Sequence, residues 1–143
     1  MIGLSDYMIL MKEAGMSGFN VKQFLHENET WKRLLEFLQA ENVYLKTRLA
    51  QITKDDHSNG LLEQIEHYHN ILISEDNTIG MLRHDVADQD KGLRKSDTEN
   101  SDFLKELGKR QKKLRKEIEI AEQKFNKLKF EFNNFFSENF TLK

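Results

Sequence analysis

Apolar residues recur at alternating spacings of three and four along three long stretches of the chain, and the last stretch is the most regular. Its two rows, each with a seven-residue period, are Leu104, Gln111, Ile118, Phe125 and Phe132, and Leu107, Leu114, Ala121, Leu128 and Phe135. A repeat of this kind, sustained over many turns, is typical of a helix that packs in a coiled coil. It predicts a helix over about residues 98–140, with Ser96 and Glu99 as one possible cap at its start.

The first stretch has the same period. Its main row is Phe24, Trp31, Leu38, Leu45 and Ile52, and its companion row is Leu35, Asn42 and Leu49. Asn20 and Gln23 have the spacing of a capping box, which predicts that the helix starts at Asn20. The polar, glycine-containing cluster at residues 55–60 is turn-forming. We therefore expect a helix over about residues 20–54.

The middle stretch predicts a helix over about residues 60–94. Its main row is Ile65, Leu72, Ile79, Val86 and Leu93, and its companion row is Leu61, Tyr68, Glu75, Leu82 and Gln89. The three helices would have similar lengths and short connections, and such neighbours run antiparallel. The predicted fold is all-α: an antiparallel three-helix coiled-coil-like bundle over residues 19–143, with a short helical extension over residues 1–18.

Antiparallel neighbours keep a constant sum of facing residue numbers, so the pairing can be predicted. For the first and second helices the apolar rows match at a sum of 113, as in Trp31 with Leu82. For the second and third helices, sums of 200 and 193 both fit. We prefer 200, because it places Gln89 opposite Gln111 and so pairs two polar residues inside the seam.

Polar residues interrupt the apolar rows at four positions: Asn42, Glu75, Gln89 and Gln111. Such residues can fix the register of packed helices at some cost in stability, and we favour this role over a ligand or proton site. A carboxylate on the seam must be solvated, paired or protonated. We therefore expect Glu75 at the edge of the seam, within reach of water or a lysine.

Composition changes this picture little. The 143 residues contain no proline, which suits long helices, and no cysteine, which permits a cytoplasmic location. The net charge of −2 gives no general attraction to nucleic acid or to anionic membranes. No apolar run is long enough to span a membrane, and the first residues do not resemble a secretory signal. We expect a cytoplasmic protein without a membrane partner.

Helical bundles can hold di-metal sites built from two Glu-x-x-His pairs and further glutamates. This chain has one such pair, Glu66 with His69, and one further candidate pair, His84 with Asp88. In the helical repeat most of these residues point away from the seam. A metal-binding bundle is therefore only the second alternative, and we expect no metal or other cofactor.

A basic run occupies residues 109–116, where six of eight positions are basic: Lys109, Arg110, Lys112, Lys113, Arg115 and Lys116. One interpretation is a phosphate-contacting stripe for nucleic acid. The other is internal pairing, because a register of 200 brings Asp85, Asp88 and Asp90 alongside the run. We favour internal pairing and keep nucleic-acid binding as the first alternative function.

Phenylalanine is concentrated near the end of the last helix. Phe130, Phe136 and Phe140 fall outside its two apolar rows. Excess apolar surface often marks an interface, so these three residues are the predicted partner interface, although a tail that folds back would explain them equally well.

Motifs of known enzyme classes are missing: the sequence has neither a glycine-rich phosphate loop nor a nucleophile elbow. We therefore expect no catalytic residues and no small-molecule substrate. The sequence favours a non-enzymatic interaction or scaffold protein that works through helix–helix contacts. Its expected partner is another copy of itself or another helical protein.

Overall fold

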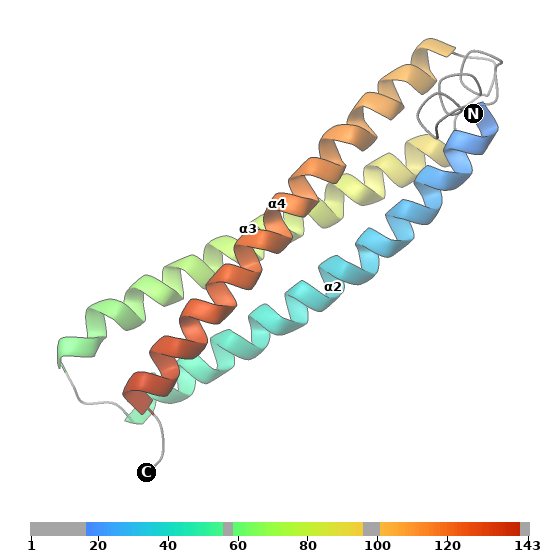
Figure 1. Ribbon diagram of the computed structural model, residues 1–143. Helices are drawn as coiled ribbons and strands as arrows, with labels where there is room; N and C mark the ends of the chain where they lie inside the picture. The colour runs from blue at the N-terminus through green and yellow to red at the C-terminus, as the bar shows by residue number, and fades with distance from the viewer. Residues whose placement is uncertain (1–16, 56–58, 96–100, 141–143) are drawn as a thin grey trace, which may run out of the picture.

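The computed structural model describes residues 17–55, 59–95 and 101–140, all of which lie in helices. The helices are α2 (Ser17–Asp55), α3 (Asn59–Lys95) and α4 (Ser101–Phe140). They pack side by side as one elongated bundle (Figure 1). The predicted all-α three-helix bundle is confirmed. The expected extension over residues 1–18 falls almost wholly outside the described residues.

The two apolar rows of each helix form the core, which runs the length of the bundle. Every helix turns its stripe of large side chains inward because this removes the stripe from water, at about 25 cal/mol per Å² of apolar surface. The core includes Leu35, Leu38, Leu45 and Leu49 of α2, Leu72, Ile79 and Val86 of α3, and Leu114, Ile118, Phe125, Leu128 and Phe132 of α4.

Direct contacts between α3 and α4 confirm the preferred register of 200. The Gln89 amide donates a hydrogen bond to Gln111 Oε1 over 3.0 Å. Towards the opposite end of the pair, the ring of Tyr68 packs edge-on against Phe132, with centroids 5.5 Å apart. For α2 and α3, Asn42 Nδ2 donates to the carbonyl oxygen of Leu72 at 2.9 Å. The residue numbers of this pair add up to one more than the predicted sum of 113.

The first and last helices run parallel, as expected when two reversals join three rods. Ion pairs between them keep a constant offset along the chain: Arg115 binds Glu27 at 2.7 Å, and Lys129 binds Glu41 at 3.2 Å. This offset places the N-terminal half of α4 beside the N-terminal half of α2 (Figure 1). The C-terminal half of α3 lies at the same end of the bundle.

The predicted helix ends agree with the structure to within a few residues, with one clear error. Helix α2 begins at Ser17, so the predicted start at Asn20 is three residues too late. A capping motif is a local preference, and a helix continues through it when the preceding residues can also be helical. The possible Ser96–Glu99 cap lies outside the described residues, and α4 begins at Ser101. None of these three helices is long and apolar enough to cross a membrane.

Candidate functional site

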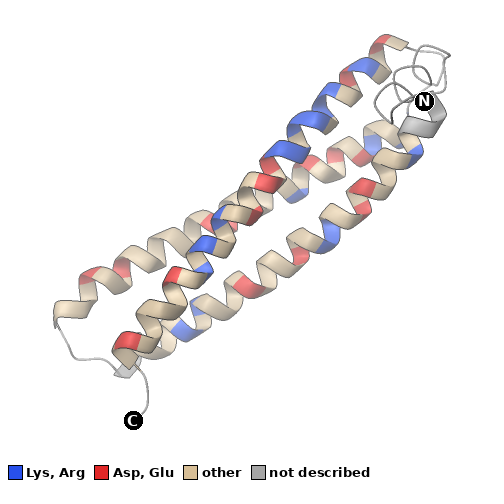
Figure 2. Ribbon diagram, viewed as in Figure 1, with Lys and Arg blue, Asp and Glu red and all other residues tan. Residues whose placement is uncertain are grey.

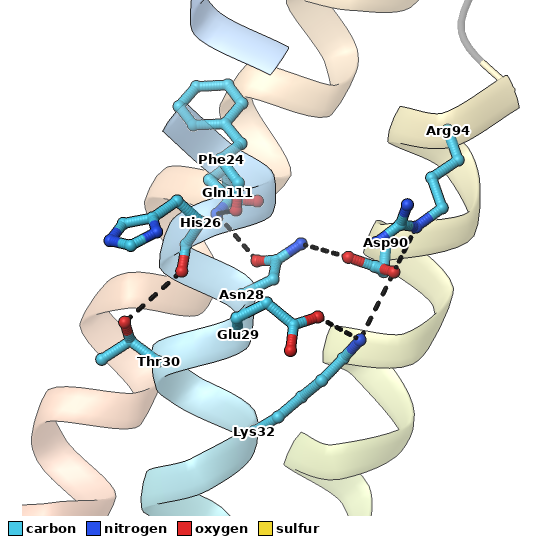
Figure 3. Close-up of polar contacts among 9 residues, drawn as sticks. All are labelled: Phe24, His26, Asn28, Glu29, Thr30, Lys32, Asp90, Arg94 and Gln111. Carbon is cyan, nitrogen blue, oxygen red and sulfur yellow. Dashed lines mark hydrogen bonds and ion pairs between the residues drawn. The ribbon is translucent and has the colours of Figure 1, made fainter. Parts of the chain in front are cut away.

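A buried polar layer crosses all three helices near the N-terminal end of α2. Gln111 of α4 is fully buried at its centre. Its amide nitrogen donates to Asn28 Oδ1 and to Glu27 Oε1, both at 2.9 Å, while its oxygen accepts from Gln89. Asn28 in turn donates to Asp90 Oδ1 of α3 over 3.4 Å (Figure 3). The layer therefore links each helix to the other two.

Asp90 is the charged member of this layer, and it is 7% exposed. Arg94 donates to it over 2.9 Å, and the Lys32 ammonium lies 3.4 Å away (Figure 3). Burial alone would raise the pKa of Asp90, but the hydrogen bonds from Arg94 and Asn28 and the charge of Lys32 outweigh it, so its pKa lies below the usual value. Asp90 is thus an ionised carboxylate whose partners are already in place.

Arg115 of α4 extends the buried polar layer towards α2. Its Nε and one terminal nitrogen both donate to the Glu27 carboxylate at 2.7 Å, a bidentate pair. The expected pairing of the basic run with Asp85, Asp88 and Asp90 is therefore wrong for Arg115 and for Asp90, whereas Asp85 and Asp88 do lie beside Arg110 and Lys113. Among the described residues, the ion pairs of Arg115 and Asp90 are to α2 or within their own helix. The cause is that residues flanking the seam border two helices and can pair with either.

A second polar contact lies towards the middle of α2. Asn42 is fully buried and donates to Asp76 Oδ1 at 2.7 Å, in addition to its bond to Leu72. Lys46 pairs with the other oxygen of the Asp76 carboxylate. Asn42 Oδ1 is left without a hydrogen-bond partner, the one buried side-chain atom so described in these helices. The unsatisfied oxygen costs stability, whereas the amide nitrogen joins α2 to α3.

Glu75 lies at the edge of the seam, as the sequence predicts for it. The side chain is half-buried. Burial raises the pKa of its carboxyl, and the charge of Lys124 on α4 partly offsets this. The charge of Lys124 thus acts on Glu75, which agrees with the expectation of a lysine near this carboxylate.

The weak metal candidates lie on the outside of α3. Glu66, His69, His84 and Asp88 are all exposed. His84 Nε2 is 3.4 Å from Asp88 Oδ2, but in residues 17–55, 59–95 and 101–140 no three potential ligands come together. The structure therefore does not build any of these residues into a multi-ligand site.

The three residues of the predicted aromatic interface differ in their burial. Phe136 and Phe140 pack against the core, with ring centroids 5.8 Å apart. Arg48 of α2 lies over the Phe136 ring, 3.7 Å from its centroid. Phe130 is different, because it is 68% exposed. Only Phe130 of the three thus keeps the large exposed surface that an interface residue offers.

A surface groove between α3 and α4 was not anticipated. Its apolar half is lined by Thr78, Met81, Leu82, Asp85, Glu117, Ile120, Ala121 and Lys124. Met81 is 67% exposed and Ile120 is 47% exposed. The polar half continues from Asp85 and Glu117 to Asp88 on α3 and to Arg110 and Lys113 on α4. Apolar residues outside the two packing rows were the sequence feature that could have revealed this groove.

The basic run remains largely on the surface. Lys109, Arg110, Lys112, Lys113 and Lys116 are exposed, whereas Arg115 is half-buried against Glu27. Figure 2 shows Lys and Arg concentrated in the N-terminal half of α4. Of the predicted nucleic-acid contacts, Arg115 is therefore already engaged within the bundle, and the other five are accessible.

These surfaces differ in what they can do chemically. The polar layers use their hydrogen-bonding groups on one another and tie the helices together, whereas the groove and the basic run face solvent. No family model, no curated protein and no solved structure matches this chain.

Proposed function

We propose that this chain is a non-enzymatic helical interaction protein whose partner is a second copy of itself. The observation that carries the proposal is the pair of exposed apolar side chains in the groove, Met81 on α3 and Ile120 on α4. The polar layers support a rigid bundle, because their hydrogen bonds hold all three helices in one register. A rigid bundle can present a helical face with little loss of entropy on binding.

An isolated exposed apolar residue is ordinary and needs no partner. Here two such residues line one groove from opposite helices, and charged Asp85, Glu117 and Lys124 border them. An apolar centre with a charged rim is the common arrangement of protein interfaces. The absence of cysteine suits a reducing compartment, and the proposed location is the cytoplasm.

The test is the solution mass of the full chain, measured by sedimentation equilibrium from low micromolar to millimolar concentration. We expect a concentration-dependent dimer. Ile120→Asp should give a monomer with unchanged helical circular dichroism, because it places a charge in the apolar half of the groove. Leu62→Asp is the matched control: Leu62 is 55% exposed on α3 and does not line the groove. A wild-type monomer throughout this range would overturn the proposal.

The aromatic end provides a competing interface for the same function. Phe130→Ser removes its most exposed ring without touching the core. If Phe130→Ser dissociates the dimer and Ile120→Asp does not, self-association is real but occurs at the aromatic end rather than at the groove.

Nucleic-acid binding is the second candidate function, and the exposed cations of residues 109–116 favour it. A gel shift with generic duplex DNA and single-stranded RNA tests it. Binding through phosphates would weaken steeply between about 50 and 200 mM salt. A Lys109→Glu/Lys116→Glu variant should then lose binding, whereas Lys124→Glu, a single change further along α4, should have a smaller effect. Lack of any shift at 50 mM salt would rule this candidate out.

A further inference from the structure

We infer that two copies associate through the α3–α4 groove side by side, about a two-fold axis parallel to the bundle. This inference rests on the proposed self-association and specifies its geometry. It follows from three observations: the register of α3 and α4, the chemistry of the residues that line the groove, and the ion pairs that these residues do not form within one chain.

The register of α3 and α4 determines which residues of two copies would face each other. Gln89 and Gln111 lie at the same level of the bundle, because they are hydrogen-bonded across the α3–α4 seam. A two-fold axis parallel to the helices leaves every level unchanged. It also exchanges the two sides of the groove, so that α3 of one copy faces α4 of the second copy. Each residue of α3 then faces the residue of the second copy's α4 that already lies at its own level.

Residues on the outer edge of the groove are complementary in this arrangement. Met81 would face Ile120 of the second copy at the apolar centre, and both line the groove. One heptad along, Asp88 would face Lys113, and both of these line its polar half. A further heptad along, Lys95 would face Glu106, and both are exposed. Two-fold symmetry forms each of these contacts twice.

Within one chain Asp88 and Lys113 line the same groove, but each has its ion pair on its own helix. Asp88 pairs with His84 of its own helix over 3.4 Å, and Lys113 pairs with Glu117 of its own helix over 3.7 Å. Both pairs are exposed: the Asp88 side chain is 62% accessible and that of Lys113 is 80% accessible. Exposed pairs of this kind contribute little, so both side chains can rearrange to bind a second copy.

The opposite orientation is electrostatically worse. If the axis were perpendicular to the helices and passed the level of Ile120, α4 would face α4 of the second copy in the antiparallel sense. Lys113 would then lie level with Lys127 of the second copy, and both are exposed. Like charges brought together across an interface suppress that arrangement, so the charges select the parallel one.

A charge exchange tests the inference with the full chain. Asp88→Lys would place like charges at both symmetric contacts, and so would Lys113→Glu. Each single variant should weaken the dimer by roughly ten- to a hundredfold in dissociation constant, because two attractive contacts become repulsive. When the two variants are mixed, each contact joins opposite charges again, so a mixed dimer should form with near wild-type affinity.

Controls make the outcome unambiguous. Lys112→Glu changes the charge equally at an exposed residue that does not line the groove, and it should neither weaken the dimer as strongly nor be rescued by Asp88→Lys. Circular dichroism of every variant checks that the bundle remains folded. If the wild type dimerises but the mixture fails to restore binding, this geometry is overturned and the proposed self-association stands. A wild type that remains monomeric overturns both.

Discussion

Replacing Gln111 with methionine should lower the free energy of unfolding by about 1 kcal/mol. Methionine has a similar length and shape, so little cavity is created, but the amide is lost. Asn28 Oδ1, on a fully buried side chain, would lose its bond from Gln111. An unsatisfied buried acceptor costs about 1–3 kcal/mol. Burial of the thioether end in place of the amide returns about 1 kcal/mol. Subtracted from the middle of the range for the unsatisfied acceptor, this leaves a net loss of about 1 kcal/mol.

Other partners of Gln111 are less affected by its removal. The Gln89 amide still donates to the carbonyl oxygen of Leu107 at 2.7 Å, and Glu27 keeps its bidentate pair with Arg115. The penalty should therefore depend on Asn28. In the double variant Asn28→Leu/Gln111→Met, the stranded acceptor is absent as well. We expect the double variant to be more stable than the sum of the single effects predicts, with a coupling of about 1 kcal/mol.

Urea unfolding provides the measurement. The single tryptophan, Trp31, is 7% exposed, so its fluorescence reports the packing of the bundle, and circular dichroism reports the helices. All variants should be compared at one fixed chain concentration, since dimerisation would add to the apparent stability. Gln123→Met is the matched control, because it makes the same change at an exposed residue of α4 and should alter stability by less than about 0.5 kcal/mol. A Gln111→Met variant as stable as wild type would refute the reasoning.

Four further substitutions test other parts of the bundle by the same unfolding measurement. Asn42→Leu should raise stability by about 1 kcal/mol, because it removes a buried acceptor that has no partner; a loss would show that the bonds of Asn42 to α3 outweigh that penalty. Glu75→Gln should stabilise the protein at neutral pH. The raised pKa of Glu75 means that its ionisation opposes folding, so the gain should shrink as pH falls towards 4, and a gain that does not vary with pH would contradict this cause. Gly80→Ala should add about 0.5–1 kcal/mol through helix propensity, since a Cβ there meets no atom within 4 Å. Gly92→Ala should gain less, because its Cβ would lie 2.9 Å from a methyl group of buried Leu107; equal gains would show that this side chain shifts at no cost.

Several features of the fold were predictable from residue spacing alone. Helices were predicted because apolar residues repeat with a helical period, and the register of α3 and α4 followed from matching Gln89 with Gln111. Asn28 is not among the predicted polar positions, although it is seven residues before Leu35 and so continues the row of Leu35, Asn42 and Leu49. Its burial was therefore predictable from the same spacing rule. The start of α2 was not, because the capping preference at Asn20 is weaker than the tendency of a formed helix to continue.

The partners of the flanking charges were decided only by the tertiary structure. A residue beside the seam lies between two neighbouring helices, and the heptad pattern is the same for either hand of the three-helix arrangement. That hand determines that Arg115 faces Glu27 of α2 and that Asp90 faces Lys32, rather than each facing the other. The same hand leaves Met81 and Ile120 together in the surface groove between α3 and α4. Residue spacing fixes most of the side chains that are buried, with Asp90 an exception, whereas the placement of the third helix fixes which exposed side chains become neighbours.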